Sequence, residues 1–187
     1  MASFSVIIPA AGKSSRFRDD HYKKPFVPLE NRAIWLHSAE KFLNRDDVKQ
    51  LILVIAAEDR PDFQDKFAAN VAILGIELVE GGDSRGLSVR NAIERVREDV
   101  DFVVVHDAAR PCLADVWIDR VFAAAVESGA ATLGIEVTST LKKVANGVIQ
   151  ETVSRESLWE SQTPQVFRRQ LLLDAFAAAT DEQLGQA

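Results

Sequence analysis

Cysteine is almost absent from this sequence, since Cys112 is the only one among 187 residues. A single cysteine excludes an internal disulfide framework and a zinc site built from cysteine thiolates. No apolar run approaches the roughly 20 residues of a membrane-spanning helix. A strand pattern begins at Phe4, which leaves no room for a signal peptide. We therefore expect a cytoplasmic protein that binds no membrane.

Positive charge is also scarce. The sequence has 22 Lys and Arg residues and 28 Asp and Glu residues, which gives a net charge of -6. This balance argues against general binding to nucleic acid or membrane surfaces. It does not exclude a small anionic substrate, whose binding depends on local cations. The hydrophobic share of 47% is ordinary for a globular protein. The length predicts one domain, 1–187, with a proper core.

Strand and helix patterns alternate along the chain. Apolar, β-branched runs predict strands at 4–8, 51–55, 76–79, 102–105 and 131–137. Helical periodicity is present at 33–43, 61–69, 87–97, 115–128 and 169–179, the fourth with Asp115 as a possible cap. This order predicts an α/β fold, Rossmann-like, with a mostly parallel twisted sheet flanked by helices.

The pattern changes after the fifth strand. Asn146-Gly147 separates two alternating segments, 139–143 and 148–153, and Asn-Gly in this setting is the strongest short hairpin signal. We expect a β-hairpin arm, approximately 138–155, that projects from the sheet. Residues 165–167 are expected to be briefly extended. The polar tail 180–187 contains no predicted element.

The loop after the first strand has the composition of an anion site. Small residues Ala10, Ala11 and Gly12 follow Pro9, and leave backbone N–H groups accessible. Lys13, Ser14 and Arg16 then add charge and hydroxyl groups. The loop either holds the phosphates of a nucleotide or is an ordinary turn with solvated cations. Its glycines match neither the Rossmann nor the Walker A pattern.

Polar residues also follow the later strands, and ligands of open α/β sheets bind beyond the carboxyl ends of the strands. Gly82 and Asp83 follow the third strand, with Ser88 shortly after them. Asp107 follows the fourth strand. Its carboxylate beside a phosphate site would suit Mg²⁺, although it could instead pair with Arg110 and shape the turn.

Three further residues, Lys24, Arg155 and Thr163, are candidates for binding anions. Lys24 could fold over the phosphates as a point charge, whereas Lys23 is interpreted as part of a solvated turn. Arg155 and Thr163 could bind a second anion. His106 is expected to make a structural hydrogen bond rather than to act as a base.

These motifs together resemble the nucleotidyltransferases that carry a Pro-Ala-Ala-Gly loop, and among them the 2-C-methyl-D-erythritol 4-phosphate cytidylyltransferase family. The matching elements occur in the family's order over nearly the whole chain. They are Pro9-Ala10-Ala11-Gly12 with Arg16, Lys24, Gly81-Gly82-Asp83 with Arg85 and Ser88, His106-Asp107-Ala108-Ala109-Arg110-Pro111, Thr140 with Lys142, Arg155, and Trp159 with Thr163-Pro164-Gln165-Val166-Phe167.

The resemblance implies CTP as the nucleotide, a sugar-alcohol phosphate as the acceptor, Mg²⁺ as the cofactor, and pyrophosphate as a product. It implies Arg16 and Lys24 as the catalytic cations, and Asp107 as the metal ligand. It implies nucleotide binding by Ala10, Ala11, Gly12, Lys13, Ser14, Gly82, Asp83 and Ser88. It implies acceptor binding by Asp107, Arg110, Thr140, Arg155 and Thr163. It also implies a homodimer in which the arm brings Thr140 and Arg155 to the partner's site.

The sequence departs from the family pattern at three places. Ser14 stands where the family has a second glycine, and Ser139 where an Asp is frequent. The family continues past residue 187 with a strand and helix that carry an Asp and a Lys, so we expect this C-terminal unit to be missing. The missing C-terminal unit leaves an impaired nucleotide-binding homologue open as an alternative. A ribitol 5-phosphate cytidylyltransferase, which has much the same motifs, is a second alternative.

Overall fold

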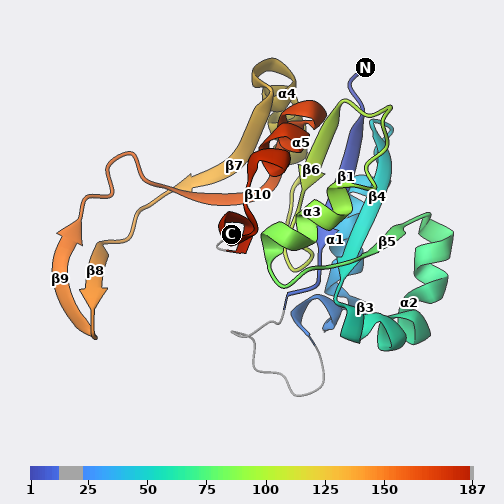
Figure 1. Ribbon diagram of the computed structural model, residues 1–187, viewed down its shortest axis with the longest axis horizontal. Coiled ribbons are helices and arrows are strands. Elements are labelled where there is room, and N and C mark those ends of the chain that lie inside the picture. The colour runs from blue at the N-terminus through green and yellow to red at the C-terminus, as the bar shows by residue number, and fades with distance from the viewer. Residues whose placement is uncertain (13–22, 186–187) are drawn as a thin grey trace.

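The computed structural model describes residues 1–12 and 23–185. Within them, six strands form one sheet in the order β5-β4-β1-β6-β10-β7 (Figure 1). The strands are β1 (Phe4–Pro9), β4 (Val48–Ile55), β5 (Glu77–Glu80), β6 (Phe102–Val105), β7 (Ala130–Glu136) and β10 (Trp159–Arg168). The first four in the sheet order are parallel, and β10 is antiparallel to both β6 and β7. The predicted α/β fold with a mostly parallel sheet is confirmed.

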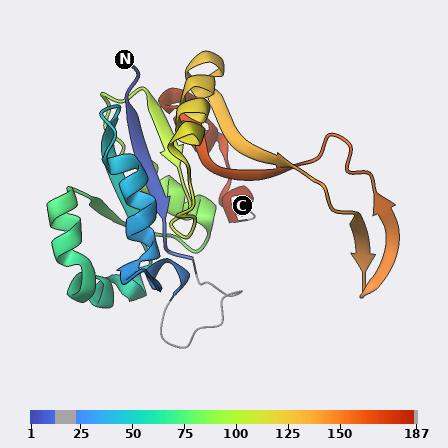
Figure 2. The same cartoon turned by 180° about the vertical axis from the view of Figure 1, so that it is seen from behind.

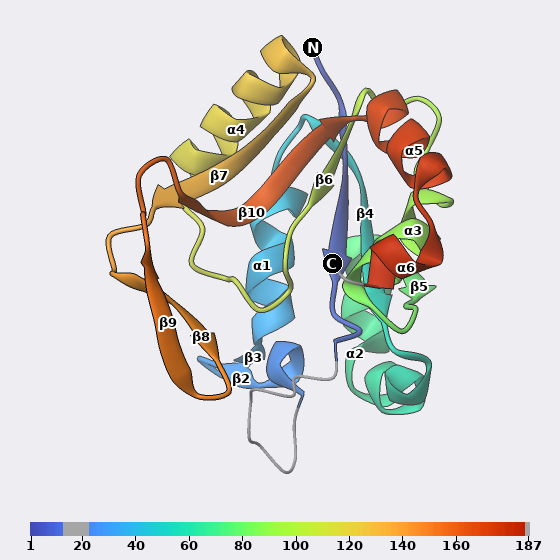
Figure 3. The ribbon, with the colours of Figure 1, turned by 60° about the vertical axis from the view of Figure 1, so that its left-hand side comes forward.

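Helices cover both faces of the sheet, as Figure 3 shows. One face packs against α1 (Ile34–Leu43), α4 (Asp115–Ser128) and Phe63 of α2 (Arg60–Leu74). The other packs against α3 (Arg85–Ile93) and α5 (Arg169–Ala178). The last helix, α6 (Asp181–Gly185), lies against α3. Two 3₁₀ turns, η1 (Lys24–Phe26) and η2 (Ala57–Asp59), and a short ribbon of β2 (Pro28–Leu29) and β3 (Arg32–Ala33) complete the described fold.

The continuous apolar runs of the central strands follow from this double covering. Along β1, Val6 and Ile8 belong to the core beside α1 and α4, whereas Ile7 belongs to the core beside α3 and α5. All three are fully buried. A strand covered on both faces favours apolar side chains at nearly every position. Within the described ranges, no helix combines the length and the apolar character needed to cross a membrane.

The predicted arm is present as β8 (Leu141–Ala145) paired with β9 (Val148–Val153), away from the main sheet (Figure 2). Asn146 has φ 51° and Gly147 has φ 77° at its tip. A two-residue turn with two positive φ angles matches the strand twist of a hairpin. The side chain of Arg155 donates a hydrogen bond to the carbonyl of Thr138, which joins the segment before β8 to the segment after β9 at the base of the arm.

Several sequence-based boundaries were wrong. The extended segment predicted at 165–167 is only the end of the ten-residue strand β10. The tail forms α6 from Asp181, where no element was predicted. Asp115 is the first helical residue of α4 rather than its cap, since Ala114 occupies the cap position. Helix α2 runs to Leu74, five residues beyond its predicted end.

Candidate active site

A cavity of about 530 Å³ lies at the carboxyl ends of the parallel strands. The residues that line it come from the loop after β1, from η1 and η2, from the β5–α3 connection and from the loop after β6. Among them are the predicted site residues Ala10, Ala11, Gly12, Lys24, Gly82, Asp83, Ser88, Asp107 and Arg110. The structure therefore brings together residues that are up to 100 positions apart in the sequence, as the strand-end argument predicts.

Glycine at position 81 allows the cavity wall to form. A Cβ atom there would lie 2.4 Å from the Cβ atom of Ala11 and 2.8 Å from Oγ of Ser88. Because Gly81 has no side chain, the chain just after β5 can lie close to both the loop after β1 and helix α3. Ser88 is buried, and its Oγ accepts a hydrogen bond from the N–H of Gly82 at 3.1 Å. This bond fixes the Gly81-Gly82 backbone against α3.

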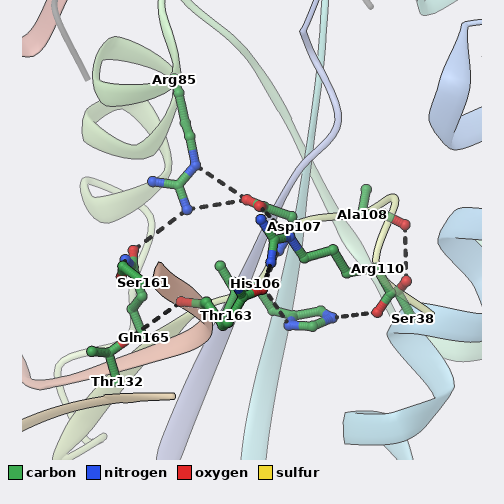
Figure 4. A network of polar contacts seen from close by, with 11 residues as sticks. Ser38, Arg85, His106, Asp107, Ala108, Arg110, Thr132, Ser161, Thr163 and Gln165 are labelled. Atoms are coloured by element: carbon green, nitrogen blue, oxygen red, sulfur yellow. Dashed lines mark hydrogen bonds and ion pairs between the residues drawn. The ribbon is translucent and has the colours of Figure 1, made fainter. Parts of the chain in front are cut away.

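Two arginines hold Asp107 at the cavity (Figure 4). Arg85 donates from Nε and Nη2 to Oδ1 of Asp107, both at 3.1 Å, and Arg110 Nε lies 3.0 Å from Oδ2. Arg85 Nη2 also lies 3.5 Å from the Gln165 side-chain oxygen. The pairing of Asp107 with Arg110, left open by the sequence, is therefore present, with Arg85 as a second partner.

Buried hydrogen bonds hold the loop that carries Asp107 in place. His106 is fully buried, and its Nε2 lies 3.0 Å from the carbonyl oxygen of Arg110. A carbonyl can only accept, so Nε2 carries the proton of a neutral ring. Thr163 then donates to Nδ1 of His106 at 3.1 Å, and its Oγ accepts from the N–H of Asp107 at 3.3 Å. From α1, the hydroxyl of Ser38 donates to the carbonyl of Ala108 at 2.8 Å.

The charge state of His106 agrees with this arrangement. Burial lowers the pKa of His106 to about 4, against the weaker raising effects of the Arg110 carbonyl and the Asp107 charge. The ring is therefore neutral near pH 7. Its role is to orient the Asp107 loop through Thr163, in line with the structural hydrogen bond expected for it.

The residues around Asp107 fit a magnesium ion that is shared with phosphate oxygens. A carboxylate offers about four lone-pair positions, and the arginines use two on Oδ1 and one on Oδ2. One position on Oδ2 thus remains for a metal. Within residues 1–12 and 23–185, no cluster of three His, Cys, Asp or Glu side chains forms a metal site by itself. Mg²⁺ commonly takes one or two carboxylates plus phosphate oxygens.

Not all predicted residues line this cavity. Lys13, Ser14 and Arg16 lie outside the described residues. Thr140 and Arg155 are exposed on the arm and at its base. Thr163 is buried and lines a second cavity of about 680 Å³, which lies between the Asp107 loop, α4 and β7 and which Arg110 also borders. The acceptor-binding roles of Thr140, Arg155 and Thr163 stay predictions.

Sequence reasoning gave no role to Arg85 and Ser84, which line the cavity, and misread the contacts of Lys23. Arg85 donates from two nitrogens to the single oxygen Oδ1 of Asp107. Ser84 caps α3 by accepting from the N–H of Leu87 at 3.1 Å, a role that its place before an apolar helical run indicates. Lys23, interpreted as solvated, instead pairs with Glu58 and Asp59. The ion pairs of Arg85 with Asp107 and of Lys23 with Asp59 join distant parts of the chain, so no local sequence pattern indicates them.

Comparison with known proteins gives a consistent result. The model of the 2-C-methyl-D-erythritol 4-phosphate cytidylyltransferase family matches residues 4–187. A curated protein of that name from Rhodopirellula baltica is 38% identical over 94% of this chain and 76% of its own length. One from Bacillus pumilus is 36% identical over 92% of this chain and 74% of its own length.

Solved structures agree with the sequence relatives. The crystal structure of 2-C-methyl-D-erythritol 4-phosphate cytidylyltransferase from Thermus thermophilus is 30% identical, with a TM-score of 0.73 over 97% of this chain and 82% of that one. A second crystal structure, of a 4-diphosphocytidyl-2C-methyl-D-erythritol synthase, has a TM-score of 0.76 at 29% identity and covers 98% of this chain and 82% of that one. By its sequence, its fold and its cavity residues, the chain belongs to the 2-C-methyl-D-erythritol 4-phosphate cytidylyltransferase family of nucleotidyltransferases.

Proposed function

We propose that this chain transfers the cytidylyl group of CTP to 2-C-methyl-D-erythritol 4-phosphate and releases pyrophosphate, a step of isoprenoid precursor synthesis. The observation that carries the proposal is the single cavity in which the Ala10–Gly12 loop, Lys24, the Gly82-Asp83 turn and Asp107 meet. The family match over residues 4–187 supports both substrates. We also propose a cytoplasmic location, which the scarcity of cysteine supports.

The cavity suits a nucleoside triphosphate. We propose that the backbone N–H groups of Ala11 and Gly12 donate hydrogen bonds to phosphate oxygens, whereas the N–H of Ala10 donates to the carbonyl of Val54 at 2.7 Å. Lys24 adds a positive charge to the lining of the same cavity. Gly82, Asp83 and Ser88, which line the same cavity, are proposed to contact the cytosine and the ribose. Arg16 and Lys24 are proposed to stabilise the negative charge that develops on the transferred phosphoryl group, while Lys13 and Ser14 complete the phosphate loop.

The reaction needs positioning and charge rather than a base. An oxygen of the acceptor phosphate forms a bond to the α-phosphorus of CTP, and the bond from that phosphorus to the bridging oxygen of pyrophosphate breaks in line. The acceptor phosphate is already ionised at neutral pH, so a neutral, buried His106 is no obstacle. Bound at Asp107, Mg²⁺ would supply charge neutralisation of the phosphates. Arg85 and Arg110 keep the carboxylate of Asp107 turned toward the cavity.

The acceptor side is proposed to involve a second copy of the chain. The arm projects from the sheet and carries exposed apolar side chains, among them Val144, Val148 and Ile149. Thr140 and Arg155 lie at its base, far along the chain from the cavity loops. In a homodimer joined through the arm, these two residues would supplement Arg110, Asp107 and Thr163 in binding the acceptor phosphate.

A pyrophosphate-release assay with CTP, Mg²⁺ and 2-C-methyl-D-erythritol 4-phosphate tests the proposal. Ribitol 5-phosphate, assayed in parallel, tests the alternative acceptor. We expect turnover with the methylerythritol phosphate and at least tenfold lower kcat/KM with ribitol 5-phosphate. Turnover with neither acceptor, together with CTP binding by calorimetry, would instead identify an impaired nucleotide-binding homologue. Sedimentation equilibrium of the chain, with and without residues 139–154, tests the dimer.

A further inference from the structure

Helix α6 packs against helix α3 (Figure 3). Leu184 of α6 is buried, and its carbonyl oxygen accepts a hydrogen bond from the Ser84 hydroxyl at 2.8 Å. The two backbones lie close together, since a Cβ atom at Gly86 would be 2.4 Å from the Leu184 carbonyl oxygen. Arg90 of α3 also forms an ion pair with Asp181 of α6. A hydrogen bond, a close backbone contact and an ion pair thus join the two helices.

The hydroxyl of Ser84 takes part in two hydrogen bonds. Its Oγ accepts from the N–H of Leu87 at 3.1 Å, which caps the beginning of α3. A hydroxyl has one proton to donate, and that of Ser84 goes to the carbonyl of Leu184. This donation fixes the rotation of the hydroxyl and leaves its lone pairs for the N–H of Leu87. The cap of α3 therefore depends on the position of α6.

The beginning of α3 in turn holds the chain that precedes it. The N–H of Ser88 donates to the carbonyl of Ser84 at 2.9 Å, and Oγ of Ser88 accepts from the N–H of Gly82 at 3.1 Å. Gly82 and Asp83 line the nucleotide cavity, whereas Leu184 is not among the described residues that line it. A continuous series of hydrogen bonds thus joins α6 to the cavity, although Leu184 lies outside the cavity lining.

We propose that Leu184 is a positioning residue for nucleotide recognition, which acts through Ser84 to place the Gly82-Asp83 turn against the base of CTP. The inference rests on the function proposed above, in which this turn contacts the cytosine and the ribose. CTP and UTP differ only in the donor and acceptor groups of the base. A displaced turn should therefore reduce the preference for CTP over UTP, which a residue that only stabilises the fold would leave unchanged.

The test compares three variants of the full chain with the wild type. Leu184→Ala removes a buried side chain that anchors α6, and Gly86→Ala places a Cβ atom against the Leu184 carbonyl. Gly185→Ala is the matched control in α6, because a Cβ atom there has no described neighbour within 4 Å. Calorimetry without an acceptor measures the affinities for CTP and UTP. Mass spectrometry measures amide hydrogen exchange in residues 82–88, and the melting temperature tests the folding of each variant.

We expect Leu184→Ala and Gly86→Ala each to weaken CTP binding by about five- to tenfold, the effect of losing one hydrogen bond and the helix cap that depends on it. The preference for CTP over UTP should fall by about threefold or more, since selectivity depends on the placement of polar groups around the base. Residues 82–88 should exchange faster, because the N–H of Leu87 loses its acceptor. Gly185→Ala should match the wild type in all three measurements.

Two results would overturn the proposal: an unchanged CTP affinity in both Leu184→Ala and Gly86→Ala, or an equal loss of affinity for CTP and UTP. If the wild type binds CTP but transfers nothing, the proposed function fails, while the affinity comparison still decides the role of Leu184. If the wild type prefers neither nucleotide, the proposed function also fails. Exchange in residues 82–88 then decides whether Leu184 places the turn, and unchanged exchange in Leu184→Ala would refute it.

Discussion

Acidification from pH 7 to pH 5 is expected to destabilise this protein through His106. The ring is fully buried as the neutral form, with Nε2–H on the Arg110 carbonyl and Nδ1 accepting from Thr163. A proton added at Nδ1 would break the bond from Thr163 and place a charge in the core. The unfolded chain binds this proton with the ordinary histidine pKa of about 6.5, and the folded chain only near pH 4.

The magnitude follows from these two pKa values. Because the folded-state pKa is lowered, the contribution of His106 to stability is complete above about pH 6.5 and is lost as the pH falls toward 4. Each pH unit between them costs about 1.4 kcal/mol of unfolding free energy. At pH 5 the loss is thus about 2 kcal/mol. The carboxyls of Asp99 and Asp101 have lowered pKa values, through the hydrogen bonds of Arg97 and Ser3 respectively, and so act below this range.

Urea unfolding of the wild type and of His106→Gln, at pH 7.0 and pH 5.0, measures this effect. The variant is expected to be less stable at pH 7 but to lose about 2 kcal/mol less between the two pH values, because it cannot titrate. Proton NMR of the wild type offers a second readout, in which the His106 ring signal should not move between pH 7.5 and 5.5. Parallel pH profiles for both proteins, or a ring that titrates near pH 6.5, would refute the argument.

Three further predictions concern the cavity. Lys24→Ala should lower kcat by about 10²-fold in the pyrophosphate assay if Lys24 stabilises the transition state; a rise in KM with unchanged kcat would contradict that role. Gly81→Ala should weaken CTP binding by at least tenfold in calorimetry, because its Cβ would lie 2.4 Å from that of Ala11. Asp107→Asn should raise the Mg²⁺ concentration needed for half-maximal rate, and an unaltered metal titration would remove Asp107 from the metal site.

The sequence was most informative where one physical cause dominates. Strands such as β1 and β6 are buried on both faces, so nearly every residue is apolar and the run is unmistakable. Strand β10 was largely missed because its first half, from Trp159 to Pro164, is exposed or polar and includes a proline. Polar side chains there serve the site, as Thr163 does for His106. Local rules fail most often at such functional places.

Helix α6 and the ion pairs of Lys23 and Arg85 could not be predicted from the sequence, because they depend on long-range contacts. Five residues give no amphipathic pattern, and α6 is held by long-range contacts instead. Leu184 is buried, its carbonyl accepts from the Ser84 hydroxyl at 2.8 Å, and a side chain at Gly86 would collide with it. The contacts of Lys23 with Asp59 and of Arg85 with Asp107 likewise join residues more than 20 positions apart. The rule that ligands bind beyond the carboxyl ends of parallel strands predicted which segments lie together. It did not predict which side chains of those segments form ion pairs.

The place of β10 in the sheet has a consequence for how the chain is made. Within the described residues, β7 pairs in the main sheet only with β10, and β10 separates it from β6. A ribosome releases residues 130–136 well before 159–168, so β7 has no partner strand of the main sheet during that interval. Meanwhile Phe102–Val105, buried in the finished protein, forms an open apolar edge that can pair with other chains. The nascent protein is therefore expected to be more prone to aggregate before β10 has been synthesised than after it has paired with β6.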